Sequence, residues 1–179
     1  MGKRALSVTA VVLGALLALG ACSNPTGPDR ANGNEDSESI SEVWTWTSGA
    51  SISNLSGIYG TNGVANATNV PGARQDAVSW SDGSGHLWLF GGTGFDSNSA
   101  GRLNDLWRFD GNAWTWVAGS SGTNEQGTYG SRGVAVEANV PGARRGAVSW
   151  SDGGGNLWLF GGDGSDSLGN SGLLNDLWR

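Results

Sequence analysis

Leu87-Trp88-Leu89-Phe90-Gly91-Gly92 decides the fold, because the same six residues return 70 positions later as Leu157-Trp158-Leu159-Phe160-Gly161-Gly162. Four consecutive apolar residues predict a short strand that is covered on both faces. The glycine pair that follows predicts a position where two stretches of backbone pack closely. A motif that recurs at so long a period indicates a repeat architecture.

The repetition extends to both sides of this motif. Four more segments recur, namely Val-Pro-Gly-Ala-Arg (70–74 and 140–144), Ala-Val-Ser-Trp (77–80 and 147–150), Asn-Asp-Leu-Trp-Arg (104–108 and 175–179) and Trp-Thr-Trp (44–46 and 114–116). The repeat therefore covers residues 43–179, in two copies of about 43–112 and 113–179.

Each copy contains segments with the composition of short strands. In the first copy they are residues 77–80, 87–90, 105–109 and 113–117, and an Asp-Gly turn follows both the first and the third. Asp-Gly is a strong hairpin signal, because glycine takes a positive φ without steric cost. We therefore predict an all-β chain in which each copy forms a four-stranded antiparallel meander.

These motifs resemble the kelch repeat. An apolar run ending in Gly-Gly is followed by an Asn-Asp-Leu-aromatic strand, and a Trp stands seven residues after that aromatic. Residues 87–92, Asn104 to Trp107 and Trp114 carry the resemblance in the first copy, and residues 157–162 and 175–178 carry it in the second. Trp107 and Trp178 stand where the family usually has Tyr. The resemblance implies two blades of a kelch-type β-propeller.

Two blades do not close a propeller, which typically needs about 4–8. The second copy ends before its fourth strand, whereas residues 43–47 supply an additional fourth strand at the beginning. Two interpretations stay open. Further repeats are missing from a truncated product, which the stop inside a repeated motif favours, or copies associate head to tail and lend residues 43–47 to a neighbour in a ring.

Residues 1–21 have the pattern of a signal peptide. Lys3 and Arg4 precede an apolar stretch, and Cys22, the only cysteine, follows Leu-Gly-Ala. This resembles the bacterial lipobox and implies diacylglycerol on Cys22 and an extracytoplasmic lipoprotein, at the outer membrane in a Gram-negative cell because residue 23 is Ser. An ordinary signal peptide with an incidental Cys is the alternative. Residues 22–42 are expected to be the lipidated Cys and a disordered tether.

Composition excludes several partners and cofactors. The formal net charge is −6, so phosphate backbones are repelled and nucleic acid is not an expected partner. The copper-radical site of galactose oxidase would need several His and Tyr ligands and a Tyr–Cys crosslink, whereas His86 is the only histidine. We expect no cofactor, no metal and no catalytic residue, and leave calcium in the oxygen-rich loops near Asp96 and Asp166 open.

The candidate ligand-binding residues lie on the long connections, residues 93–103 and about 118–143, which a meander places at the end opposite to its tight turns. Long loops on a rigid scaffold are where binding usually occurs. The candidates are Tyr59, Arg74, Tyr129 and Arg144. The two tyrosines are expected to be exposed aromatic contacts, whereas the alternative for each arginine is a structural partner of an Asp carboxylate such as Asp105.

Most of the remaining repeated residues are expected to build the core between blades. They are Trp88, Gly91, Gly92, Trp107, Trp114, Trp158, Gly161, Gly162 and Trp178. The sequence thus predicts a membrane-anchored binding module for polysaccharide or a surface protein. The alternative is a fragment of an extracellular carbohydrate-active enzyme, a sugar isomerase or an oxidase-like protein.

Overall fold

Eleven β-strands and no helix form between residues 43 and 179, the part of the chain that this computed structural model describes. The predicted signal peptide, Cys22 and the predicted tether lie outside these residues. In the described part, no helix is present that is long and apolar enough to cross a membrane. All strands belong to the unit Thr45–Arg179.

The first sheet is a four-stranded antiparallel meander of β2 (Val78–Ser81), β3 (Leu87–Phe90), β6 (Leu106–Phe109) and β7 (Trp114–Ala118). Its strand order follows the chain, and each strand lies within one residue of its expected range. Asp82 and Asp110 cap the two hairpin turns by accepting backbone N–H groups, Ser84 and His86 in one case and Asn112 and Ala113 in the other. The predicted meander is confirmed here.

The second sheet repeats this arrangement without a fourth meander strand. It contains β8 (Arg144–Arg145), β9 (Val148–Ser151), β10 (Leu157–Ser165) and β11 (Ser171–Trp178), in which β10 pairs with the other three. Among the described residues, no strand pairs with β11 on the side away from β10.

The connection at residues 93–103, expected to be a loop, is mostly a hairpin. β4 (Thr93–Phe95) and β5 (Ala100–Arg102) pair with each other, and β1 (Arg74–Gln75) joins β4. The Asp96 carboxylate accepts the backbone N–H groups of Asn98 and Ser99 and so builds the turn between β4 and β5. In the second copy the same hairpin is the continuation of β10 and β11.

The glycine pairs make the bends that separate the two halves of each copy. Gly91 and Gly92 have φ values of 64° and 96°, and Gly161 and Gly162 repeat them at 66° and 97°. A Cβ on Gly91 would lie 2.8 Å from the carbonyl oxygen of Arg144. The positions therefore require glycine for both conformation and space, as the sequence predicts.

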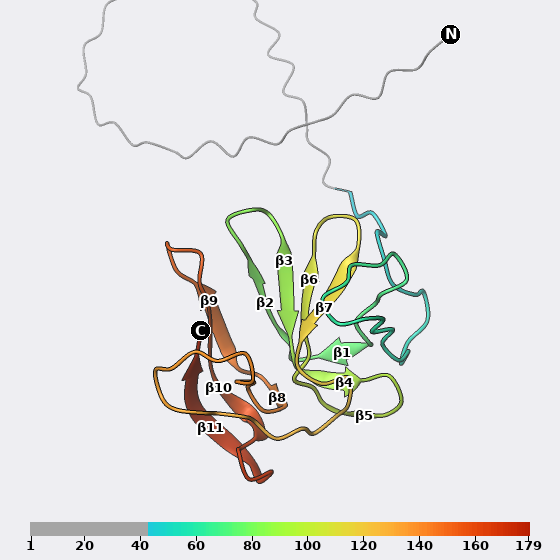
Figure 1. Cartoon of the computed structure of the whole chain (residues 1–179). Coiled ribbons are helices and arrows are strands. Elements are labelled where there is room, and N and C mark those ends of the chain that lie inside the picture. The colour runs from blue at the N-terminus through green and yellow to red at the C-terminus, as the bar shows by residue number, and fades with distance from the viewer. Residues whose placement is uncertain (1–42) are drawn as a thin grey trace, which may run out of the picture. The chain divides into compact units, whose positions relative to one another are not determined.

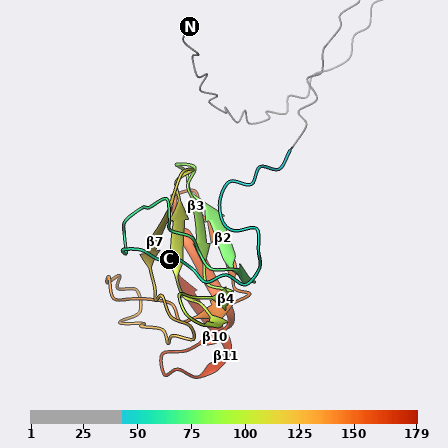
Figure 2. The ribbon, with the colours of Figure 1, turned by 90° about the vertical axis from the view of Figure 1, so that its right-hand side faces the viewer.

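The core lies where the two sheets pack face to face. Val78, Trp80 and Phe90 of the first sheet form one buried cluster with Leu159 of the second. Trp80 Nε1 donates to the carbonyl oxygen of Trp158 at 3.0 Å and joins the sheets. Figure 1 shows the two sheets beside each other, and Figure 2, turned by 90°, shows the first in front of the second.

Residues 43–47 pair with no strand among the described residues, so the expectation that they form a strand beside a further blade stays a prediction. One expectation about the core is wrong. Trp88 and Trp158 are half-buried rather than buried between sheets, because the indole N–H of each turns to the Asp of its own hairpin turn, Asp82 or Asp152. Neither sheet closes on itself.

Candidate functional site

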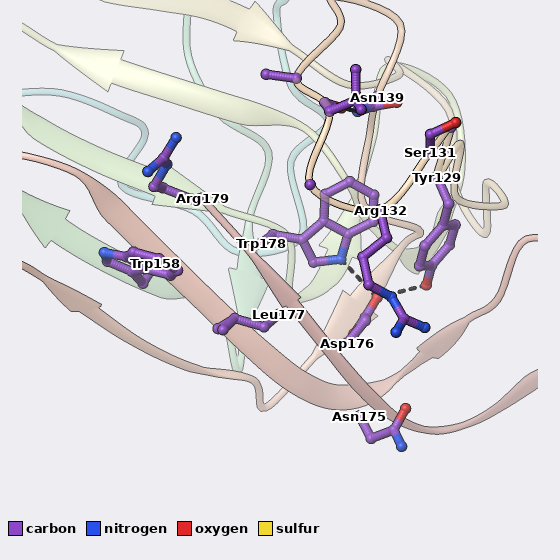
Figure 3. Close-up of a pocket in the computed structure, with 14 residues that line it drawn as sticks. Tyr129, Ser131, Arg132, Asn139, Trp158, Asn175, Asp176, Leu177, Trp178 and Arg179 are labelled. Atoms are coloured by element: carbon purple, nitrogen blue, oxygen red, sulfur yellow. Dashed lines mark hydrogen bonds between the residues drawn. The ribbon is translucent and has the colours of Figure 1, made fainter.

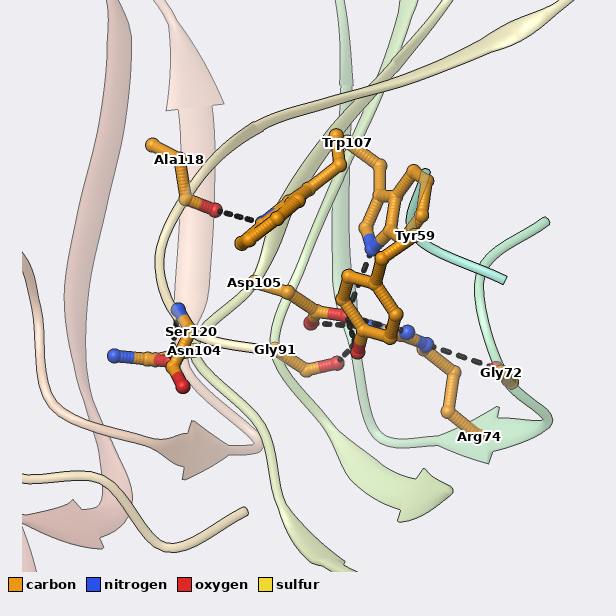
Figure 4. A network of polar contacts seen from close by, with 10 residues as sticks. Tyr59, Gly72, Arg74, Gly91, Asn104, Asp105, Trp107, Ala118 and Ser120 are labelled. Atoms are coloured by element: carbon orange, nitrogen blue, oxygen red, sulfur yellow. Dashed lines mark hydrogen bonds and ion pairs between the residues drawn. The ribbon is translucent and has the colours of Figure 1, made fainter. Parts of the chain in front are cut away.

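In the first copy, three side chains that recur in both copies meet around the carboxylate of Asp105, which also recurs (Figure 4). Arg74 donates from Nη1 and Nη2 to the two oxygens of Asp105, at 2.6 and 2.8 Å. Tyr59 Oη and Trp107 Nε1 both donate to Asp105 Oδ2 at 2.7 Å. We call Tyr59, Arg74, Asp105 and Trp107 the first carboxylate cluster.

This cluster joins three connections that are distant in the sequence. Arg74 Nη1 also donates to the carbonyl oxygen of Gly91 at 3.0 Å, and its Nε donates to that of Gly72 at 3.1 Å. Tyr59 lies in the connection that leads into the first sheet, and Gly91 lies in the bend after β3. Asp105 is the residue that precedes β6. The cluster therefore fixes the bases of the long connections against the sheet.

Burial and the number of its internal hydrogen bonds indicate a structural role for the first cluster. Asp105 and Trp107 are fully buried, and Tyr59 is only 6% exposed. Burial, followed by the charge of Asp105, raises the pKa of the Tyr59 phenol far above its ordinary value. The carboxylate accepts four hydrogen bonds from protein groups, one on Oδ1 and three on Oδ2.

The expectation of exposed tyrosine contacts is therefore wrong for Tyr59, and the guanidinium groups of Arg74 and Arg144 are turned inward. Arg144 is only 1% exposed and donates to Gly142 O, Gly161 O and Asp176. Each arginine instead pairs with an Asp carboxylate, which was the alternative for these residues. Asp105 and Asp176 each accept hydrogen bonds from an Arg, a Tyr and a Trp side chain.

The second carboxylate cluster has the same geometry but opens onto a cavity (Figure 3). Arg144 donates to Asp176 at 2.6 and 2.8 Å, Tyr129 Oη at 2.6 Å and Trp178 Nε1 at 2.7 Å. Tyr129 is half-buried. The cavity has a volume of about 930 Å³, and we call it the edge cavity; its lining includes Tyr129, Gly133, Asn139, Asp176 and Trp178.

The second cluster has shifted acid–base properties. Burial and the hydrogen bond to Asp176 raise the pKa of Tyr129 to about 12. Burial opposes ionisation of Asp176, but the donors Arg144, Tyr129 and Trp178 outweigh it and lower its pKa to about 2. Because the folded pKa is below the unfolded value of about 4, Asp176 stabilises the fold above pH 4, and this contribution is lost as the pH falls toward 2.

An ion-pair network joins the small sheet of β1, β4 and β5 to the second sheet. Arg102 of β5 donates to both oxygens of Asp163 of β10 at 2.9 Å, and Arg145 lies 3.1 Å from the same carboxylate. The hydrogen bond from Arg102 lowers the pKa of Asp163. The network is partly exposed, and sequence reasoning missed it because Asp163 has no acidic counterpart in the first copy.

No group of three or more His, Cys, Asp or Glu residues is placed to hold a metal ion within residues 43–179. In the loops where calcium was left open, the carboxylates of Asp96 and Asp166 accept hydrogen bonds from their own turns. His86 Nδ1 lies 2.8 Å from Asp82 Oδ2 in the hairpin turn between β2 and β3.

Comparison of the chain with protein-family models, with curated proteins and with solved structures found no match.

Sequence reasoning paired the arginines with Asp carboxylates as an alternative, but did not connect the Tyr and Trp of each cluster to them. The signal that unites the four was present, since Tyr59, Arg74, Asp105 and Trp107 all recur at an offset of 70 or 71 residues as Tyr129, Arg144, Asp176 and Trp178.

Proposed function

We propose that the chain is a lipid-anchored interaction module outside the cytoplasm, built from blades of a kelch-type β-propeller. It binds a polysaccharide or another surface protein through the long connections at one end of its sheets. The anchor rests on Cys22 and the leader before it, and the blades rest on the repeated motifs and the antiparallel meander.

One observation supports binding at that end in particular. The turns between β2 and β3 and between β6 and β7 lie at one end of the first sheet, and the small sheet of β1, β4 and β5 lies at the other (Figure 1). The carboxylate clusters tie the long connections at this second end to the sheets. Rigidly held loops whose tips are free are suited to binding.

The side chains at the loop tips favour a protein partner over a polysaccharide. Sugar rings are usually stacked on exposed aromatic side chains, but Tyr59 is enclosed in its cluster and Tyr129 is half-buried. The turn between β10 and β11 instead presents Leu168, which is 80% exposed, between Ser167 and Gly169. We place the contact with a protein partner at Leu168, because it is the exposed aliphatic side chain of this turn.

Leu168→Asp is expected to weaken binding to the protein partner at least tenfold without changing stability, because a charge then replaces an apolar contact. Ser84→Asp is the matched control, since it adds the same charge in an exposed turn at the opposite end of the sheets. Binding to whole cells and to a glycan array, with both variants, is the measurement. Loss of binding with Ser84→Asp only, or glycan binding that neither variant changes, would contradict the assignment.

Cys22→Ser is expected to move the protein from the membrane fraction to the soluble fraction and to abolish labelling by radioactive palmitate, because the thiol that carries the lipid is lost. Ser23→Ala, next to it, is the control and is expected to stay in the membrane fraction. A wild-type protein that takes up no label and is freely soluble would show that the leader is an ordinary signal peptide.

A further inference from the structure

We propose that Asn66 accepts an N-linked glycan, which is transferred to its side-chain amide from a lipid-linked oligosaccharide outside the cytoplasm. The proposal rests on the export that the proposed function assumes, but it is independent of binding at the loop tips. It selects Asn66 over Asn54, the other Asn of the chain that lies in a suitable tripeptide.

The acceptor motif for N-glycosylation is Asn-X-Ser/Thr, in which X is any residue except Pro, and it marks surface loops of exported proteins. The chain contains this motif twice, as Asn54-Leu55-Ser56 and as Asn66-Ala67-Thr68. Asn24-Pro25-Thr26 is excluded by its Pro. A motif this short also arises by chance, so the choice of Asn66 rests on the structure around it.

The tripeptide at 66–68 lies on an exposed turn that is held against the first sheet. Asn66 and Thr68 are both exposed, and the backbone N–H of Asn66 donates to the carbonyl oxygen of Trp114 at 3.3 Å. Trp114 is the first residue of β7 and follows the Asp110 turn. The turn therefore presents its side chains to solvent in a fixed position beside β7.

The side chain of Asn66 is arranged so that its amide nitrogen is free. Asn66 Oδ1 accepts from the backbone N–H of Thr68 at 2.9 Å and from Thr68 Oγ1 at 2.8 Å. Asn66 Nδ2, to which a sugar would be attached, donates to no atom within residues 43–179. Two hydrogen bonds to the amide oxygen stabilise the negative charge that develops there when the nitrogen loses a proton. Thr68 thus favours reaction at Nδ2.

The fold itself does not require the side chains of Asn66 and Thr68. Their counterparts in the second copy are Val136 and Ala138, neither of which has a polar side chain. The turn forms nevertheless, since the backbone hydrogen bond that closes it is 3.0 Å long in both copies. The amide and the hydroxyl are therefore present in addition to what the repeat needs, which leaves them for another role.

Asn54 differs from Asn66 in this respect. It recurs 70 residues later as Asn124, and the two have φ values of 61° and 60°. Asn is one of the residues that tolerate this left-handed conformation. Asn54 therefore belongs to a turn that both copies contain, and its conservation between the copies has a backbone explanation that Asn66 lacks.

The transfer forms one bond and breaks one. Asn66 Nδ2 bonds to the anomeric carbon of the first sugar, and the bond from that carbon to the oxygen of the lipid diphosphate breaks. The diphosphate leaves with the electron pair, and the proton from Nδ2 goes to a base of the transferase. An oligosaccharyltransferase supplies the catalysis, so this chain contributes only the acceptor.

Glycan transfer to the folded, purified full-length protein tests the proposal. The reaction contains a lipid-linked oligosaccharide and an oligosaccharyltransferase that requires only Asn-X-Ser/Thr, and peptide mass spectrometry measures the occupancy of each Asn. Occupancy at Asn66 is expected to be at least ten times that at Asn54. A protein without glycan at Asn66, or with equal occupancy at the two positions, would overturn the proposal.

Two variants separate geometry from the identity of the third residue. Ser56→Thr combined with Thr68→Ser exchanges the hydroxyl residues, and the preference for Asn66 is expected to persist because Ser also carries a hydroxyl at this position. Val136→Asn combined with Ala138→Thr places the motif on the equivalent turn and is expected to gain a glycan. A preference that moves to Asn54, or a second turn that stays unmodified, would contradict the argument from geometry.

The protein from the cells that produce it separates this proposal from the proposed function. Protein that takes up palmitate, and is therefore exported, but carries no glycan at Asn66 would overturn the proposal and leave the proposed function intact. Protein that takes up no palmitate would contradict the lipid anchor, whereas the transfer to purified protein needs neither export nor a loop ligand and still decides whether Asn66 is an acceptor.

Discussion

Asp105→Ala is expected to lower the free energy of unfolding by about 3–5 kcal/mol, because it leaves a buried guanidinium without its counter-ion. Arg74 is 6% exposed at its side chain and cannot reach water to replace the lost bonds. Tyr59 Oη and Trp107 Nε1 lose their acceptor in the same substitution. Since small domains are stable by about 5–15 kcal/mol, a large part of the stability is expected to disappear.

Urea unfolding followed by circular dichroism at neutral pH measures this loss, and Asp163→Ala is the matched control. Asp163 also pairs with arginine, but its side chain is 27% exposed, so that water replaces the lost partner and the expected cost is below about 1 kcal/mol. If Asp105→Ala instead left stability unchanged and removed ligand binding, the first carboxylate cluster would be a binding site and not a clamp.

Trp107→Ala is the second large effect, with an expected loss of about 3–5 kcal/mol in the free energy of unfolding. The side chain is fully buried. The centroid of its ring lies 4.9 Å from that of Tyr59 and 6.4 Å from that of Trp114. Removing it leaves a cavity that these rigid rings cannot collapse to fill.

Trp88→Ala is the comparison for this prediction and is expected to cost clearly less. Trp88 is half-buried, and its indole N–H is bound to Asp82 at the end of the sheet. The same urea titration measures both variants. A loss for Trp88→Ala that equals or exceeds that for Trp107→Ala would mean that the core lies at the hairpin end and not around the carboxylate cluster.

Sequence alone predicted the parts of the fold that depend on local chemistry. The apolar run of β3, the Asp-Gly turns and the glycine pair each act through neighbouring residues, and the four strands of the first sheet lie within one residue of the expected ranges. In the order β2-β3-β6-β7, short turns join β2 to β3 and β6 to β7, so these pairs are adjacent in space, whereas the hairpin of β4 and β5 lies between β3 and β6.

Residues whose role depends on distant partners were harder to assign. Tyr59 lies in a long connection between glycine-rich segments and resembles an exposed loop residue, yet its phenol bonds a carboxylate 46 residues away. The hairpin of β4 and β5 was also missed, because Thr-Gly-Phe and Ala-Gly-Arg lack the alternation of apolar and polar residues that marks a strand.

The sequence repeat could not show which equivalent residues are covered. Trp80 and Trp150 lie in identical Ala-Val-Ser-Trp segments, and the difference in their exposure depends only on what packs against each sheet. The structure separates the two, since the second sheet covers Trp80 whereas Trp150 is exposed.

Urea unfolding of Asp105→Ala beside Asp163→Ala tests the central claim most directly, which is that the carboxylate clusters hold the long connections on the sheets. The account predicts a loss of about 3–5 kcal/mol in the free energy of unfolding for Asp105→Ala and of less than about 1 kcal/mol for Asp163→Ala. Equal losses in the two variants would contradict the account.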